Sequence, residues 1–389
     1  MKSLVALCLF LCLARSALAA EPVLEVRTYP EARLYSHELD GRGRFRSGLL
    51  QNLAVVNHGA TPLTVQRIEL ELLREGEVLA TQSVGPAELA RVAPAMAAQA
   101  QGGLLELLAF QFRPELLLGK GVTLADSPTL GDGQALLLTH RVFAWRAPAD
   151  ALRIRAHARD ANGGAVVAER TLAVAEPATG TVYQFPLRGT WFVGAGASLH
   201  SGHRWVVMEE YALDLMQLGA GSRTFKGDGQ ALADYYAYGA EVRAAAAGTV
   251  VSVVDDVPET TATLRRPDEA ADAYLQRVMA MQNDNLARGA RYVSGNLVVL
   301  RHAQGEYSMY AHLKPGSVKV KPGASVAAGA VLGQLGHSGN STEPHLHFQL
   351  CDAPEVMACA GLPVRFAGVE LPYADFPREL QSGDIVIAR

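Results

Sequence analysis

The sequence predicts a mainly β protein with an export signal, two domains and a helical insertion in each domain. Three observations predict this organisation. The chain has 389 residues, enough for two domains with their own cores. Apolar and polar residues alternate at the period of half-buried strands in the first half. Further along, glycine becomes frequent, and nine of the eleven histidines fall after position 139.

Residues 1–19 predict a signal peptide. Lys2 supplies a short positive region, Leu4 to Leu13 form an apolar run, and Ala17-Leu18-Ala19 is a small-x-small cleavage site. The apolar run is too short to span a bilayer, and no later stretch of about eighteen apolar residues exists. We therefore expect an exported chain, periplasmic or secreted, with no transmembrane segment.

Composition and charge indicate an ordinary soluble globular protein. The formal net charge is −4, and removal of the signal with Lys2 and Arg15 gives about −6 (−4 minus 2). Since no basic run stands out, a nucleic-acid partner is not expected.

Two of the four cysteines, Cys8 and Cys12, leave with the signal. Cys351 and Cys359 remain, and an even number of cysteines in an exported chain predicts one disulfide. A pair of buried free thiols is the alternative. Two cysteines are too few for a zinc thiolate cluster.

The first domain, 20–175, is predicted to be a β-sandwich, immunoglobulin-like in its strand spacing. The segment 85–112 is rich in Ala and Leu and predicts a helical insertion with a break near Gly102-Gly103. The expected strands are Asn52 to Asn57, Ile68 to Leu72, a strand at Val78-Leu79 after a turn at Glu75-Gly76, Leu136 to Trp145 and Leu152 to His157.

A linker is predicted at 176–184, within and after an Ala-Glu-Pro-Ala-Thr-Gly segment, and a second domain at 185–389. Inside this domain, Pro267 to Arg288 predicts a helix ended by Gly289. Tyr274, Val278 and Met281 would form its apolar stripe. We favour a surface helix that covers a sheet edge; the alternative is a wall of a substrate groove.

His345-Leu346-His347 is the most informative motif of the second domain. Residues two apart on a strand project to the same face, so two imidazoles enter one small volume. Imidazole is a common metal ligand and a general base near neutral pH. Taken alone, such a triplet more often marks a solvated strand face.

Asp214 lies in an apolar strand, Tyr211 to Leu215, where a carboxylate is costly unless it is paired or binds a metal. A salt bridge with an arginine such as Arg243 is the alternative. His312, in Tyr310-Ala311-His312-Leu313, and the neighbouring His200 and His203 are further candidates for chemistry.

The second domain resembles the lysostaphin/LytM-type zinc metallopeptidases, which have the fold of the duplicated hybrid motif. The resemblance covers roughly 185–350, and its most specific part is Gly339 to Phe348. The rest of the ordered series is Tyr238-Gly239, Val242-Arg243-Ala244, Gly248-Thr249-Val250, Gly295-Asn296 with His302, Tyr310 to Leu313, and Gly323 to Gly336.

The resemblance implies an antiparallel β-sheet and one Zn²⁺ per chain. It assigns His347 and Asp214 as metal ligands, and His312 and His345 as unliganded catalytic histidines. His203 is our choice for the first histidine ligand, with His200 as the alternative. The family places this histidine close before the aspartate, whereas His203 precedes Asp214 by eleven positions. We expect a hairpin of two strands to bridge that gap.

The resemblance further implies a zinc-dependent endopeptidase that cleaves peptide crosslinks of peptidoglycan. No His-Glu-x-x-His motif is present, so histidine must replace glutamate in acid–base catalysis. Two alternatives stay open. One is a non-catalytic or regulatory wall-binding member of the family, and the other is a zinc peptidase that acts on secreted proteins. The first domain would position the substrate or limit access to the groove.

Overall fold

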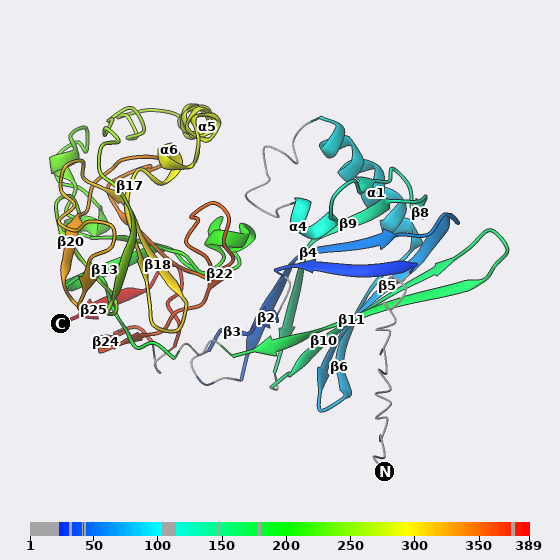
Figure 1. Ribbon diagram of the computed structural model, residues 1–389. Coiled ribbons are helices and arrows are strands. Elements are labelled where there is room, and N and C mark those ends of the chain that lie inside the picture. The colour runs from blue at the N-terminus through cyan, green and yellow to red at the C-terminus, as the bar shows by residue number, and fades with distance from the viewer. Residues whose placement is uncertain are drawn as a thin grey trace, which may run out of the picture.

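The structure is a computed structural model that describes residues 23–30, 33–40, 42, 44–102, 114–146, 148–176, 180–374 and 378–389. It is mainly β, as predicted, and its strands form an N-terminal and a C-terminal body that lie side by side (Figure 1). The predicted signal, 1–19, lies outside the described residues, as do positions 177–179 of the predicted linker. The domain boundaries therefore stay predictions.

The N-terminal body contains two sheets. In the first, β4 (Arg46–Asn57) lies between β1 (Leu24–Tyr29) and β9 (Gln134–Trp145), with β7 (Thr123–Leu124) beyond β9 and β3 (His37–Glu38) also paired to β4. In the second, the order is β2 (Arg33–Tyr35), β11 (Ala165–Ala175), β10 (Ala151–Arg159), β5 (Leu63–Arg74) and β6 (Glu77–Val84), with β8 (Thr129–Leu130) on β5.

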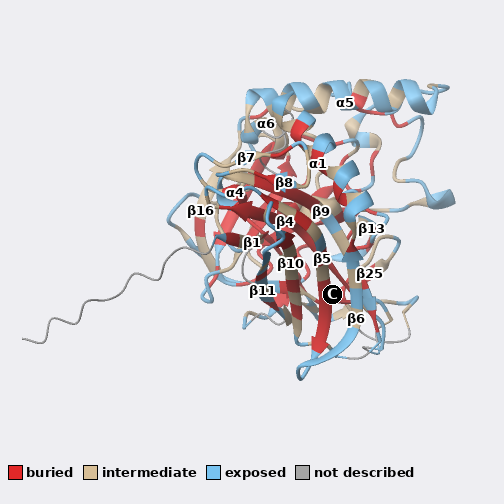
Figure 2. Ribbon diagram, turned by 90° about the vertical axis from the view of Figure 1, so that its right-hand side faces the viewer, coloured by how far each residue is buried: buried red, intermediate tan, exposed pale blue. Residues whose placement is uncertain are grey.

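The two sheets bury a shared apolar core. Ile68, Leu70 and Leu72 alternate along β5 and are fully buried, and they join Leu53 and Val55 of β4 in one cluster. Burial is concentrated in these central strands (Figure 2). The strands expected in this domain lie within β4, β5, β6, β9 and β10. The strands β1 and β11 were not predicted. The likeness to an immunoglobulin domain stays a prediction.

The predicted helical insertion begins with α1 (Pro86–Gln101), which starts with proline in its first turn and ends at Gly102. Leu89, Ala93 and Ala97 are its buried residues, and Leu89 and Ala93 belong to the sandwich core. The remainder of the insertion to residue 113 lies outside the described residues, and α4 (Pro114–Leu118) follows it.

The C-terminal body is built on a ten-stranded sheet whose adjacent strands pair antiparallel. Its order is β19 (Ser325–Val326), β16 (Gly248–Val254), β17 (Asn296–Arg301), β18 (Tyr307–Leu313), β21 (Leu346–Cys351), β14 (Leu213–Met216), β13 (Gly189–Ala195), β25 (Ile385–Ala388) and β24 (Val369–Glu370), with β22 (Gly361–Leu362) also on β21. Two small sheets accompany it, β15 (Glu241–Arg243) with β20 (Val331–Gln334) and β12 (Tyr183–Gln184) with β23 (Phe366–Ala367).

Alternation along the central strands separates the core from the candidate site. Tyr310 of β18 and Leu346 and Phe348 of β21 belong to the main apolar cluster. Their neighbours Ala311 and His347 line a cavity instead. Because successive side chains of a strand point to opposite faces, the apolar half of this pattern fixes which face presents His347.

The predicted helical interruption is α5 (Ala271–Arg288), followed by α6 (Ala290–Ser294). It ends at Gly289 as predicted, but it begins at Ala271 and not at Pro267. The preceding residues form a turn in which Asp268 has a φ of 59° and Glu269 accepts hydrogen bonds from the Arg266 backbone and the Arg277 side chain. The inner face buries Val278, while the outer face is exposed (Figure 2).

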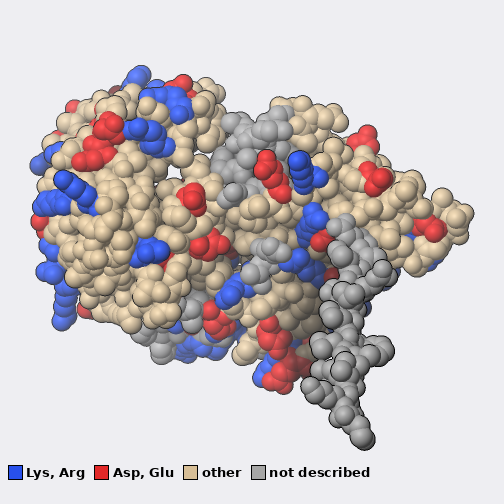
Figure 3. All heavy atoms as spheres, viewed as in Figure 1, with Lys and Arg blue, Asp and Glu red and all other residues tan. Residues whose placement is uncertain are grey.

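The surface mixes both signs of charge. On the face shown in Figure 3, Lys and Arg side chains are interspersed with Asp and Glu. Within the part of the chain that the structure describes, none of the helices combines the length and the apolar character needed to span a membrane.

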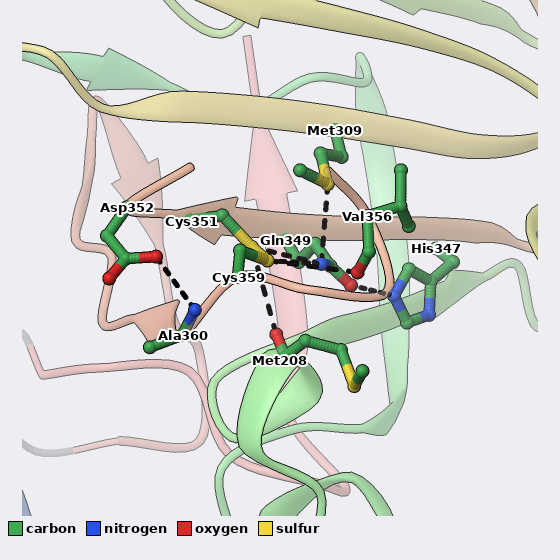
Figure 4. Close-up of a disulfide and its surroundings, with 9 residues drawn as sticks. All are labelled: Met208, Met309, His347, Gln349, Cys351, Asp352, Val356, Cys359 and Ala360. Carbon is green, nitrogen blue, oxygen red and sulfur yellow. Dashed lines mark hydrogen bonds between the residues drawn. A yellow bond between two sulfur atoms is a disulfide. The ribbon is translucent and has the colours of Figure 1, made fainter. Parts of the chain in front are cut away.

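Cys351 and Cys359 form a disulfide with an S–S distance of 2.07 Å, which confirms the predicted pairing (Figure 4). Both cysteines are buried beside Met208, Met309 and Ala311 in a small cluster behind the end of β21. The bond therefore anchors the loop that follows the strand carrying His347.

Replacement of both cysteines by alanine is expected to lower the free energy of unfolding by about 2–3 kcal/mol, since the disulfide restricts a short loop in the unfolded chain. Urea unfolding of the variant and of the reduced wild type measures this, and both should show the same loss. A change below about 0.5 kcal/mol would show that the bond contributes nothing to stability.

Candidate metal centre

A groove of about 510 Å³ lies on the face of the C-terminal sheet that presents His347. Strands β14, β18 and β21 contribute to its floor. Gln282, Asn283 and Leu286 of α5 line one wall, and Val356 and Met357 of the disulfide loop line another part. The helical insertion therefore forms a wall of the groove. This was the alternative prediction; the one that we favoured was a surface helix covering a sheet edge.

Asp214 and His347 meet because their strands pair. In the register between β14 and β21, Asp214 lies directly opposite His347, and its Oδ1 is 3.0 Å from His347 Nδ1. His203 approaches from a 3₁₀ turn, η1 (His203–Trp205), and its Nε2 is 3.4 Å from Asp214 Oδ2. The three donor atoms lie within 4.8 Å of one another.

The structure selects His203 over His200 for this cluster. His200 is exposed and belongs to neither of the His/Asp groups found among the described residues. The expected hairpin is wrong, because the gap before Asp214 is filled by η1 and a second 3₁₀ turn, η2 (Val207–Glu209). Their i→i+3 bonds keep the segment compact, which lets a histidine far from Asp214 in sequence reach it.

The two histidines predicted to be catalytic lie beside the trio. His312 is at the end of β18 with a φ of 60°, and His345 directly precedes β21. Their ring centroids are 4.8 Å apart, and His345 Nε2 is 3.3 Å from Asp214 Oδ1. All five predicted site residues therefore line one groove.

Backbone carbonyls set the tautomers of these two histidines. His312 Nδ1 is 2.7 Å from the carbonyl of Ser338, and His345 Nδ1 is 2.7 Å from the carbonyl of Glu343. Because a carbonyl only accepts, each Nδ1 must donate, and each Nε2 keeps its lone pair when the ring is neutral. In both rings, Nε2 is thus the atom left for proton transfer.

Gln349 orients His347 and was not recognised from sequence. Its Oε1 is 2.8 Å from His347 Nε2, so that nitrogen donates and Nδ1 is left to face Asp214. The amide nitrogen of Gln349 in turn contacts the sulfur of Met309 at 3.4 Å and that of Cys351 at 3.2 Å (Figure 4). Its position two residues after His347 on the same strand face is the signal that would have found it.

The charges of the metal-free cluster are strongly coupled. Burial opposes ionisation of Asp214, but the positive charge of His203 and His345 holds the pKa of Asp214 well below its usual value. Burial disfavours the charged form of His347 too, yet the hydrogen bond and charge of Asp214 raise its pKa to about 9. Burial, then repulsion from His345 and His347, lowers the pKa of His312 well below its usual value.

This donor set fits a divalent metal ion. Two imidazoles and one carboxylate, with a further coordination position open, are the ligands of catalytic zinc sites. The salt bridge considered for Asp214 is not formed, because Arg243 pairs with Glu241 and with the carbonyl of Gly329. Without a metal, protons on the neighbouring histidines balance the negative charge of Asp214. A bound cation would take over this role and displace those protons.

Two other histidines have structural partners. His302 bonds to the Ala247 carbonyl and the Ser308 hydroxyl, as expected of a structural residue. His337 bonds to Thr263 and, through Nδ1, to Ser341 Oγ, which lies 3.2 Å from His345 Nδ1. His337 therefore supports the loop that leads into His345.

Residues 268–357 match the model of Peptidase family M23. This match confirms the resemblance to lysostaphin-type metallopeptidases. The matched segment contains His312, His345 and His347, whereas His203 and Asp214 precede it. His203 and Asp214 are therefore linked to the site by their contacts with each other and with His347.

Three curated proteins are similar to part of this chain. They are DD-carboxypeptidase/endopeptidase Mpg of Neisseria meningitidis serogroup B (34% identical over 110 residues, 26% of this chain and 23% of the relative), Peptidoglycan DD-endopeptidase ShyA of Vibrio cholerae (31% over 98 residues, 25% and 22%) and Cell division protein DipM of Caulobacter vibrioides (44% over 62 residues, 16% and 10%). The chain thus covers less than a quarter of the length of each relative.

Two solved structures are also similar. The catalytic domain of lysostaphin from Staphylococcus simulans shares 17% identity, with coverage of 45% of this chain and 88% of that chain and a TM-score of 0.25. A putative peptidase M23 from Pseudomonas aeruginosa shares 17% identity, with coverage of 57% and 77% and a TM-score of 0.27.

If His203, Asp214 and His347 bind the ion, His203→Ala is expected to weaken zinc binding by at least about 100-fold, because it would remove one of three protein ligands. His200→Ala is the matched control and should bind zinc like the wild type. Chelator competition with the metal-free proteins measures both affinities. Weaker binding by His200→Ala than by His203→Ala would reverse the ligand assignment.

Proposed function

We propose that this chain, of which residues 268–357 match peptidase family M23, is an exported zinc-dependent endopeptidase that hydrolyses peptide crosslinks of peptidoglycan. The observation that carries the proposal is the convergence of His203, Asp214 and His347 beside His312 and His345 on the floor of one groove. The similar Vibrio protein, Peptidoglycan DD-endopeptidase ShyA, supports the substrate class, and the similar Neisseria protein, DD-carboxypeptidase/endopeptidase Mpg, supports peptidase activity.

His203 Nε2, the carboxylate of Asp214 and His347 Nδ1 would hold the ion. Bound there, Zn²⁺ would act as a Lewis acid that lowers the pKa of water and polarises a peptide carbonyl. Asp214 contributes a negative charge that offsets part of the ion's charge. Gln349 keeps His347 in the tautomer that presents Nδ1.

His345 and His312 would move the protons. The Nδ1 of each is committed to a backbone carbonyl, so each Nε2 can accept a proton from the attacking water. The protonated ring can then donate to the oxyanion of the peptide carbonyl and to the leaving amine. Two histidines in the groove allow one to accept the proton while the other supports the developing negative charge.

The wall of the groove favours an internal peptide bond over a free C-terminus. Gln282, Asn283, Asn340 and Thr342 line the groove and offer uncharged donors and acceptors to a peptide backbone. Among the described residues, no lysine or arginine lines it. A terminal carboxylate would therefore find no guanidinium or ammonium group there to bind it.

Two features support action outside the cytoplasm. The signal predicted at 1–19 would direct export, and a disulfide such as that between Cys351 and Cys359 is typical of an oxidising compartment. Peptidoglycan lies in the same compartment as a periplasmic or secreted enzyme.

Zinc analysis and digestion of purified sacculi test the proposal together. The wild type should hold one zinc per chain and release soluble fragments. Asp214→Ala should lose both properties. His345→Ala should retain zinc but digest about 10²–10⁴-fold more slowly, because only its proton transfer is removed.

Other outcomes would point elsewhere. A wild type with neither zinc nor digestion would remove the proposal. Bound zinc with a biological effect that survives His345→Ala would indicate a regulatory wall-binding protein. Cleavage of secreted proteins but not of sacculi would indicate the other class of substrate.

A further inference from the structure

The ring of His203 is held differently from those of the other site histidines. His312, His345 and His347 each have a ring nitrogen fixed by a hydrogen bond within the C-terminal domain. The buried Nδ1 of His203 has no hydrogen-bond partner among the described residues. Apart from the contact of Nε2 with Asp214, the position of this ring therefore depends on the backbone of the turn that carries it.

That turn is bound by the N-terminal sandwich. Gln51 Nε2 donates to the carbonyl of Arg204 at 3.0 Å, and His140 Nε2 lies 3.1 Å from the carbonyl of Trp205. These are the two carbonyls that directly follow His203. The green 3₁₀ turns lie on the side of the C-terminal body that faces the sandwich (Figure 1).

Gln51 and His140 form a cross-strand unit. The register of β4 and β9 pairs Leu50 with Arg141 and Asn52 with Thr139, which places Gln51 opposite His140. His140 has a φ of 55°, a left-handed conformation that costs energy for a residue with a Cβ atom. The strained residue, His140, is therefore the one whose side chain reaches the other domain.

The same glutamine also holds the far end of the turns. Its Nε2 is 3.1 Å from Glu210 Oε2, and Glu210 pairs with the fully buried Arg204 at 2.7 Å. Arg204 stacks on the ring of Tyr211 at 4.9 Å. On the opposite side, β22 packs so closely that a Cβ atom on Gly361 would lie 2.9 Å from the Met208 carbonyl. The turns are thus clamped between the two domains.

We propose that the N-terminal domain positions the first metal ligand, with Gln51 and His140 as positioning residues that hold the His203 turn against Asp214. Docking of the sandwich then sets the affinity of the site for its metal. This inference rests on the proposed metal-binding role of His203. It gives the first domain a part in assembling the site, besides any effect on access to the groove.

Metal binding to the full mature chain tests the inference. His140→Gly removes the hydrogen bond to Trp205 but tolerates the positive φ, so the metal-free protein should not lose thermal stability. Gln51→Leu keeps the side-chain volume and removes both amide donations. Gln82→Leu is the matched control, because Gln82 donates to the Val142 carbonyl within the sandwich.

Each of His140→Gly and Gln51→Leu should weaken Zn²⁺ binding about tenfold, the lower end of the effect of outer-shell contacts. Both should also change the visible spectrum of the Co²⁺-substituted protein, which reports ligand geometry. Gln82→Leu should match the wild type in both. If Gln51→Leu does not fold, His140→Gly decides.

The inference is overturned if His140→Gly and Gln51→Leu bind metal within about twofold of the wild type, or if Gln82→Leu weakens binding as much as they do. In either case, a wild type that binds zinc and digests sacculi leaves the proposed function standing. A wild type that binds no zinc removes both proposals at once.

Discussion

The partly buried contact between Asp214 and His347 is the constraint on which the rest of the C-terminal domain depends. A carboxylate inside a sheet must be compensated by hydrogen bonds, protons or a cation. Here its oxygens lie within 3.4 Å of ring nitrogens from a turn, a loop and a strand. Elements distant in sequence are therefore brought together around one negative charge, and the pairing of β14 with β21 fixes that charge in place.

Around this charge, the protein controls which ring nitrogen each histidine presents. Carbonyls of Ser338 and Glu343 fix two rings, and Gln349 fixes a third. The disulfide sulfur of Cys351 contacts the amide nitrogen of Gln349 and so helps to hold that side chain in place. His203 is the exception, because its restraint comes from the other domain through Gln51 and His140. A site assembled in this way links metal affinity to the docking of two domains.

Local patterns in the sequence predicted what depends on neighbours along the chain. Alternation at Ile68, Leu70 and Leu72 located a buried strand, and Gly289 located a helix end. The ordered motifs identified the family, and the predicted site residues line one groove. The start of α5 was placed too early, because Glu269 uses its side chain to close a turn before the helix.

Long-range contacts left no such pattern. The sequence favoured His203 but left His200 open as the first ligand, since the position of each ring depends on 3₁₀ turns that lie between two domains. Gln51 is 153 positions from Arg204, and its role is visible only once both domains are folded. The role of Gln349 was not predicted for a different reason. A glutamine on a strand face indicates a function only once the ring orientation of its neighbour His347 is considered.

Anomalous diffraction at the zinc edge from crystals of the zinc-loaded mature protein tests the central claim most directly. The account predicts one peak per chain, within bonding distance of His203 Nε2, the Asp214 carboxylate and His347 Nδ1. A peak among His312, His345 and His347, which form the second His group of the groove, would contradict it. So would the absence of any peak in the groove.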